Sequence, residues 1–140
     1  MTYVSHVRPR WSDMDLYGHV NHANVVTLLE EARVPVLFGE AVKEGLTELP
    51  KGVVVVKLAV HYRAPIVARP EGSVRVEMEL TELKASTVTL GYRVHGGPDE
   101  TDPVAVTAET VLAPYDTVKL RPRRLSEAEG EFLKRVFAGA

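Results

Sequence analysis

The chain has 140 residues, an apolar share of 45% and a formal net charge of -2, values typical of one globular domain spanning residues 1–140 and not of a disordered or fibrous chain. It contains no cysteine, which excludes disulfides, thiolate nucleophiles and cysteine-based metal sites. The weak net charge gives no general attraction for nucleic acid. No apolar run approaches the roughly 18 residues that span a bilayer, and no apolar export segment follows Met1, so we expect a cytoplasmic protein.

The predicted elements begin with a strand over residues 3–11 and an amphipathic helix over residues 24–44. In the second segment, valine, leucine and alanine recur at helical spacing, and charged residues take the other positions. Pro35 falls in the middle of this pattern, where it removes one backbone hydrogen bond and clashes with the preceding turn. We therefore expect a kink or break at Pro35 and the end of the helix at Gly45.

Four strands are predicted next. Residues 53–64 form a long apolar strand that Pro65 ends, because proline cannot donate to a ladder. Residues 73–82 and 86–94 alternate between apolar and polar side chains, which is the period of a half-buried strand. A short hairpin link joins these two runs, and a loop rich in turn-forming residues leads to the last run at 104–114.

A capping box at residues 126–129, Ser-Glu-Ala-Glu, predicts a short C-terminal helix. The element order is therefore strand, long helix, four strands and short helix. Consecutive hairpins with clean alternation favour an antiparallel sheet whose one face is covered by the helix, which is an α+β fold. The sequence has no glycine-rich phosphate-binding motif.

Functional side chains concentrate in residues 12–24, between the first strand and the long helix. The segment contains two carboxylates, two imidazoles and two side-chain amides. Its end forms the start of the helix, where unpaired N–H groups and the positive end of the helix dipole can stabilise an oxyanion. A carboxylate just upstream can then attack a carbonyl as nucleophile or activate a water as base.

Simpler interpretations of the same residues stay open. Either aspartate can be a turn residue, and either asparagine can be a helix cap. His19 and His22 are spaced i, i+3 and, with Asp15, resemble a possible metal-ligand set, but no HExxH accompanies them. We expect neither a metal nor a cofactor.

Residues 11–33, WSDMDLYGHVNHANVVTLLEEAR, resemble the signature of the hotdog-fold acyl-CoA thioesterases of the 4-hydroxybenzoyl-CoA thioesterase type, with E-x-A-R on the helix. HYRAPIVARPEG, at residues 61–72, resembles the family's proline-bearing turn between two strands. The resemblance implies a hotdog fold, in which a curled antiparallel five-stranded sheet wraps one long central helix, here with the short C-terminal helix added. It also implies hydrolysis of an acyl-CoA or acyl-carrier-protein thioester.

The resemblance implies two catalytic residues. Asp15 takes the position of the family's carboxylate, acting as nucleophile or general base, and His22 lies at the oxyanion site at the helix start. It implies further substrate contacts at positions in the same segment, namely Gly18, His19, Ala23 and Asn24.

A coenzyme A substrate also needs cations for its phosphates, and arginine pairs bidentately with phosphate. The candidate contacts are Arg63, Arg121 and Arg123. The alternative for each of them is a solvated basic side chain.

Two other functions remain open from the sequence. One is a hotdog hydratase or dehydratase acting on enoyl or hydroxyacyl thioesters, and the other is a non-catalytic acyl-CoA binding module. We expect a homodimer or a dimer of dimers, because so small a domain cannot easily enclose both an acyl chain and a pantetheine arm. The apolar strand from Val53 to Val60 has the character of a sheet edge that a second chain covers.

Overall fold

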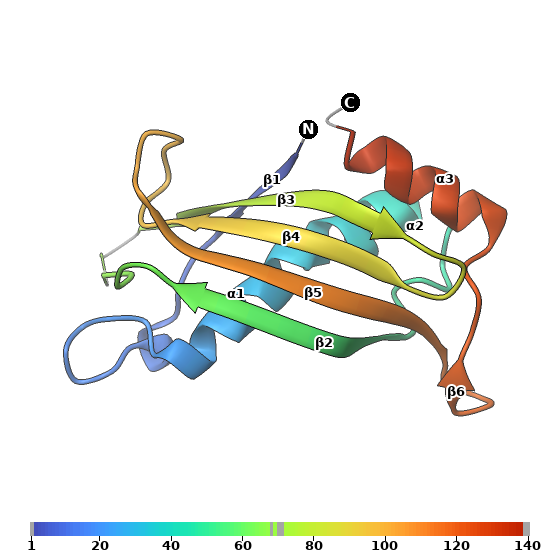
Figure 1. The fold of residues 1–140 in the computed structure, drawn as a ribbon, viewed down its shortest axis with the longest axis horizontal. Helices are drawn as coiled ribbons and strands as arrows, with labels where there is room; N and C mark the ends of the chain where they lie inside the picture. The colour runs from blue at the N-terminus through green and yellow to red at the C-terminus, as the bar shows by residue number, and fades with distance from the viewer. Residues whose placement is uncertain (1, 68, 70–71, 139–140) are drawn as a thin grey trace.

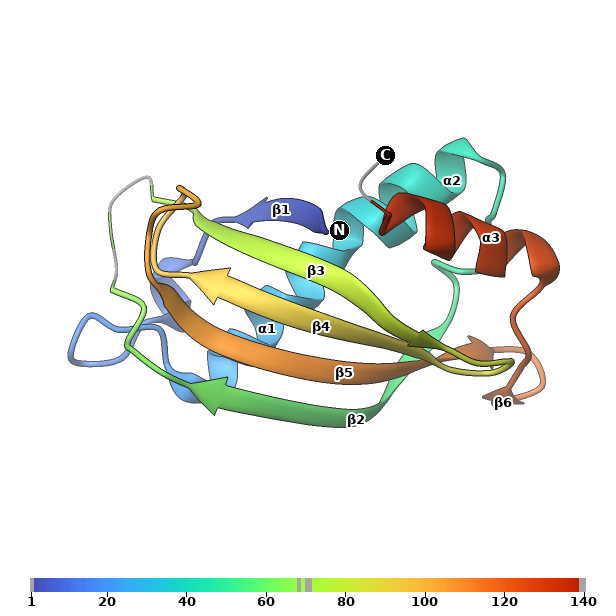
Figure 2. The ribbon, with the colours of Figure 1, turned by 45° about the horizontal axis from the view of Figure 1, so that its top comes forward.

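The computed structural model describes residues 2–67, 69 and 72–138. Its antiparallel sheet has the strand order β1-β3-β4-β5-β2, and it curls around one side of the long helix (Figures 1 and 2). The predicted α+β architecture is confirmed. The strands are β1 (Tyr3–Val7), β2 (Val53–Tyr62), β3 (Val74–Leu83), β4 (Val88–His95), β5 (Val104–Asp116) and the two-residue β6 (Arg121–Pro122), which pairs with the end of β5.

The sequence predicts a kink or break at Pro35, but the backbone stays helical through residues 34, 35 and 41, and what changes at the proline is the hydrogen-bonding pattern. Helix α1 (His22–Val34) leads into the π-helical segment η2 (Pro35–Glu40) and then into α2 (Ala41–Lys43). Because Pro35 has no N–H to donate, the α-helical ladder is interrupted there, and the chain continues with i to i+5 bonds. Gly45, at φ 78°, ends the element in the left-handed conformation that suits a helix C-terminus.

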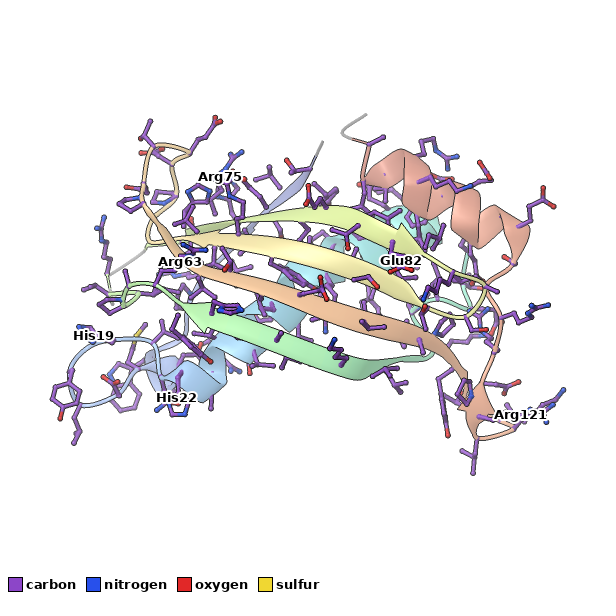
Figure 3. All side chains as sticks on the ribbon, in the orientation of Figure 1. His19, His22, Arg63, Arg75, Glu82 and Arg121 are labelled. Atoms are coloured by element: carbon purple, nitrogen blue, oxygen red, sulfur yellow. The ribbon has the colours of Figure 1, made fainter. Side chains whose placement is uncertain are left out.

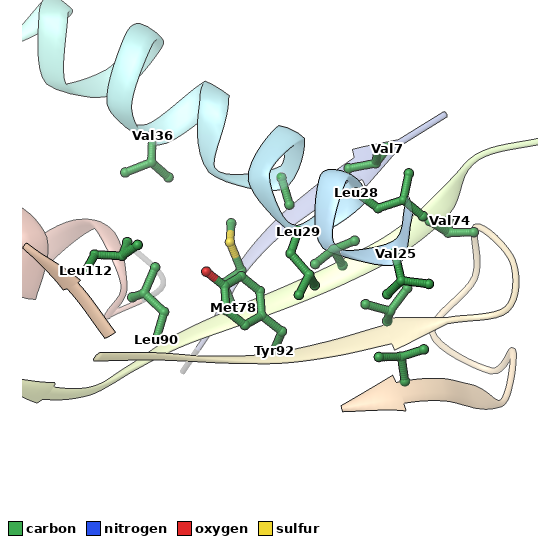
Figure 4. Packing of buried hydrophobic residues seen from close by; sticks show 14 of the residues in the cluster. Val7, Val25, Leu28, Leu29, Val36, Val74, Met78, Leu90, Tyr92 and Leu112 are labelled. Atoms are coloured by element: carbon green, nitrogen blue, oxygen red, sulfur yellow. The ribbon is translucent and has the colours of Figure 1, made fainter. Parts of the chain in front are cut away.

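The core lies between α1 and the concave face of the sheet (Figure 4). Leu28 and Leu29 of the helix pack against residues such as Val76, Met78 and Tyr92, and all five are nearly or fully buried. The predicted alternation of β3 and β4 is confirmed, because the apolar positions of both strands point inward to this layer.

Helix α3 (Glu127–Val136) begins at the predicted capping box, in which Ser126 and Glu129 exchange hydrogen bonds. Burial would raise the pKa of Glu129. The hydrogen bonds from the Arg123 guanidinium, two of 2.7 Å, and from Ser126, together with the charge of Arg123, outweigh burial and lower that pKa. Phe132 and Leu133 of α3 are buried in the core, and helix α3 lies next to α2 (Figure 2). The helix therefore closes the end of the sheet away from the start of α1.

Strand β2 lies at an edge of the sheet, as its sequence predicts, and pairs only with β5 in the described part of the chain. Large apolar side chains are exposed along it, between 38% and 62%, at Val54, Val55, Val56 and Leu58. Within residues 2–67, 69 and 72–138, no helix combines the length and the apolarity that a membrane crossing requires.

Candidate active site

The two aspartates of the segment between β1 and α1 have different environments. Asp13 is 1% exposed, and its carboxylate accepts hydrogen bonds from the Arg10 main chain at 2.7 Å and the Arg10 guanidinium at 2.9 Å. Burial acts to raise the pKa of Asp13, but these bonds outweigh it and lower the pKa. Asp13 is therefore a structural residue, held ionised beneath the loop.

Asp15 stabilises a tight turn through its side chain and also lines a cavity. Its Oδ1 accepts hydrogen bonds from the N–H groups of Tyr17 at 2.8 Å and His19 at 3.2 Å, the geometry of an Asx turn. Gly18, at φ 74°, allows the chain to double back so that His19 O accepts from Asp15 N–H. In the described part of the chain, no group bonds to the second carboxylate oxygen, Oδ2, and Asp15 lines a cavity.

The start of α1 is capped by Asn21, so the cap interpretation of this asparagine is confirmed. Its side-chain oxygen accepts from the Ala23 N–H at 2.9 Å. Ala23 was expected to contact substrate, but its N–H is already engaged in this hydrogen bond. Among the described residues, nothing accepts from the N–H of His22, which leaves it as the available donor of the first turn. Asn24 does not line the cavity that Asp15 lines, and its side-chain amide donates to the Asp13 carbonyl at 3.3 Å.

The cavity has a volume of about 430 Å³ and lies between the loop that carries Asp15, the start of α1 and the segment after β2. The structure brings Asp15, His19, His22 and Arg63 together around it, and His19, His22 and Arg63 lie at the same end of the molecule (Figure 3). The remaining walls are largely apolar: Val20, Val25, Tyr62, Ala64, Pro65, Ile66 and Val106.

Sequence reasoning missed Tyr62, the last residue of β2. Its hydroxyl donates to the main-chain oxygen of His22 at 2.6 Å, and its ring meets the His22 ring edge to face, with centroids 6.3 Å apart. The two residues are 40 positions apart in the chain, and only the tertiary fold brings the end of β2 to the start of α1 (Figures 1 and 2). Tyr62 thus fixes the first turn of α1 against the edge strand.

Two of the predicted phosphate contacts are not part of this cavity. Arg121 lies at the opposite end of the molecule from His19 and His22 (Figure 3). Arg123 is engaged in the bidentate ion pair with Glu129. Within one chain, only Arg63 of the three arginines reaches the cavity. Across residues 2–67, 69 and 72–138, no three histidine, aspartate or glutamate side chains gather closely enough to hold a metal ion.

Residues 9–136 match the model of the thioesterase-like superfamily. No functionally curated protein is significantly similar in sequence. A thioesterase from Thermus thermophilus, solved with coenzyme A and Zn, is 25% identical, with a TM-score of 0.74 over 96% of this chain and 94% of that one. A putative thioesterase from Pseudomonas aeruginosa is 26% identical, with a TM-score of 0.74 over 91% and 95%.

A predicted thioesterase from Bacillus stearothermophilus has a TM-score of 0.80 over 96% of both chains at 17% identity, a likeness of fold alone.

Proposed function

Because the chain belongs to the thioesterase-like superfamily, it is a thioester hydrolase, and we propose that it cleaves an acyl-CoA or acyl-carrier-protein thioester in the cavity at the start of α1. One observation carries the proposal: a carboxylate and a helix N-terminus line the same cavity, and within the described residues neither Oδ2 of Asp15 nor the N–H of His22 has a hydrogen-bond partner. The Thermus relative was solved with coenzyme A, which supports the same substrate class here.

In the proposed reaction, the thioester carbonyl points at the N–H of His22. The helix dipole and this donor stabilise the negative charge that develops on the carbonyl oxygen. Asp15 either attacks the carbonyl carbon, giving a mixed anhydride that water then hydrolyses, or removes a proton from a water that attacks directly. Both routes release a carboxylate and the thiol. The hydrogen bond from Tyr62 keeps the His22 peptide in place.

The substrate is also proposed to lie between two subunits. Strand β2 has a free edge, and a second copy of β2 can pair with it antiparallel. This pairing would bring the Val53 end of one β2 next to the Tyr62 end of the other. Since β6 follows the end of β5 that pairs with Val53, Arg121 of the partner subunit would approach the cavity mouth. Arg121 thus remains a proposed phosphate contact, together with Arg63 of the same chain.

A panel of acyl-CoA and acyl-carrier-protein thioesters, read with a thiol-reactive dye, tests the proposed function. The chain has no cysteine, so the protein itself gives no background. Catalytic release of thiol from at least one thioester is the expected result. Tight binding without thiol release would favour the binding module, and loss of enoyl absorbance without thiol release would favour the hydratase. A cytoplasmic location stays a prediction from the sequence.

A further inference from the structure

Two charged residues of α1, Glu30 and Arg33, line one hollow on the side of the molecule where β2 is unpaired. The hollow has a volume of about 220 Å³ and lies between α1, η2 and the start of β2. Three apolar side chains at its wall are well exposed, Val34 at 44%, Phe38 at 57% and Val55 at 50%. Both charges come from the E-x-A-R motif on the helix, to which the proposed chemistry gives no role.

The charge of Arg33 has no counter-ion within the described part of the chain. The residue is 8% exposed, and its Nη1 donates to the hydroxyl of Tyr92 at 3.0 Å. Among the described residues, none of the ion pairs within 4.0 Å includes Arg33 or Glu30. Burying a guanidinium without a carboxylate costs free energy. The hollow therefore fits an occupant that brings a carboxylate to Arg33, and the exposed carboxylate of Glu30 beside it can receive a cation of the same occupant.

A second copy of this chain meets both requirements. Helix α1 and strand β2 run in opposite directions, because Tyr62 contacts His22 at one end, whereas Val53 and Val55 lie beside Arg33 at the other. If two β2 strands pair antiparallel about a two-fold axis, the two α1 helices also lie antiparallel across it. In such a contact, residue i of each copy meets residue j of the other.

We propose that Glu30 of each subunit forms an ion pair with Arg33 of the partner subunit, giving two reciprocal pairs inside an apolar interface. The exposed valines and Phe38 around the hollow are then covered in the same contact, which removes water from the pairs and strengthens them. The inference rests on the proposed dimer and names the contact that holds it in register. The ion pairs hold the dimer together and take no part in the hydrolysis, so the quantity to measure is the dimer dissociation constant.

Charge reversal tests the reciprocal pairs. In Glu30→Arg, two arginines face each other at each contact, and in Arg33→Glu, two glutamates do. Each variant alone loses both pairs and is expected to raise the dimer dissociation constant by at least about 30-fold, which is the effect of breaking even one buried charge pair. In an equimolar mixture of the two variants, every contact again joins opposite charges, so a heterodimer is expected to form with near wild-type affinity. Sedimentation and native mass spectrometry of a mixture with one tagged variant measure both effects.

The matched control is the exposed pair Glu131 and Lys134 on α3, which has the same i, i+3 spacing at 3.3 Å. Glu131→Arg and Lys134→Glu are expected to leave the dissociation constant unchanged. If Arg33→Glu does not fold, a set of neutral variants takes its place. The set consists of Glu30→Met, Arg33→Met and the double variant that carries both substitutions. The double is then expected to dimerise more tightly than the two single effects added together predict.

Wild-type affinity of both reversed variants, absence of heterodimer rescue, or additive effects in the neutral set would each overturn the pairing. Thiol release by the wild type is measured separately, so a failed pairing is distinguishable from a failed hydrolase. A wild-type chain that is an active monomer would overturn the pairing and the dimer while leaving the hydrolase in place.

Discussion

At the scale of single residues, two aspartates only two positions apart perform different tasks because their surroundings differ. Asp13 is buried and neutralised by Arg10. Asp15 lines the cavity, and no described residue bonds to its second carboxylate oxygen. The sequence located the cluster and singled out Asp15, but only by resemblance. It could not show that Ala23 is engaged by Asn21 or that Tyr62 reaches His22, because these contacts depend on loop geometry and on strand order.

Asp13→Asn is expected to lower stability by about 1.5–3 kcal/mol at neutral pH, the usual contribution of a hydrogen bond to a charged group. The folded-state pKa of Asp13 is lowered, so its stabilising effect is present above the ordinary carboxyl pKa of about 4 and is lost as pH falls through the folded value. Thermal unfolding from pH 7 down to pH 2 checks this. The wild type and the variant should converge at the acid end, and a constant difference across the range would contradict the assignment.

Tyr62→Phe keeps the ring against His22 and removes one hydrogen bond. We expect kcat to fall by about 5-fold, the equivalent of about 1 kcal/mol, with KM nearly unchanged, because the hydroxyl orients the helix start without touching substrate. Steady-state kinetics separate the two parameters. Tyr115→Phe, on β5, serves as the control and should leave both unchanged; a rise in KM alone for Tyr62→Phe would mean that the hydroxyl contacts substrate.

At the scale of elements, hydrophobic periodicity and punctuating residues predicted most of the fold. Period-two alternation predicted β3 and β4, and the capping box predicted α3. Pro35 was predicted to kink or break the long helix, and the structure has a π-helical segment there in a helix that continues. The first strand was predicted too long, because Trp11 begins a separate short 3-10 turn, Trp11–Asp13. The position of β2 beside β5 depends on contacts far apart in the chain, so alternation within one strand carries no information about it.

Alanine substitutions at two glycines, Gly52 and Gly39, are expected to change the stability of the fold in opposite directions. A Cβ at Gly52, just before β2, would lie 2.3 Å from the carbonyl oxygen of Tyr115, so Gly52→Ala should force the backbone apart and cost about 1–3 kcal/mol. A Cβ at Gly39, in η2, meets no atom within 4 Å, so Gly39→Ala should stabilise the protein by about 0.5–1 kcal/mol. Chemical denaturation of both variants checks the pair, and equal effects would contradict the packing at Gly52.

At the scale of the whole molecule, one chain places its cavity at one end of α1 and two of its candidate phosphate-binding arginines at the other. An antiparallel pairing of two β2 strands resolves this separation, because it brings opposite ends of two chains together. The exposed Val55 of β2 lines the same hollow as Glu30 and Arg33, for which the described part of the chain supplies no ion pair. The chain is therefore expected to function as a pair.

Val56→Lys places a charge on the exposed edge of β2, where Val56 is 62% exposed. Lysine on an edge strand opposes strand pairing, so we expect this variant to dissociate into monomers at concentrations where the wild type is dimeric, with its folded stability retained. Ala85→Lys, in the exposed turn between β3 and β4, is the control. Sedimentation velocity over a concentration series measures both, and a dimeric Val56→Lys variant would exclude the β2 edge as the interface.

Asp15 is proposed to perform the hydrolysis, and the kinetics of Asp15→Asn test this most directly. Asparagine keeps the oxygen that accepts from Tyr17 and His19, so the loop should hold its shape while the charge is lost. Asp116→Asn is a matched control, because Asp116 also accepts two main-chain hydrogen bonds in an exposed turn, from Val118 and Lys119. With the best thioester of the panel, kcat of Asp15→Asn should fall at least about 100-fold and that of Asp116→Asn should not change. Full turnover by a folded Asp15→Asn variant would contradict the account.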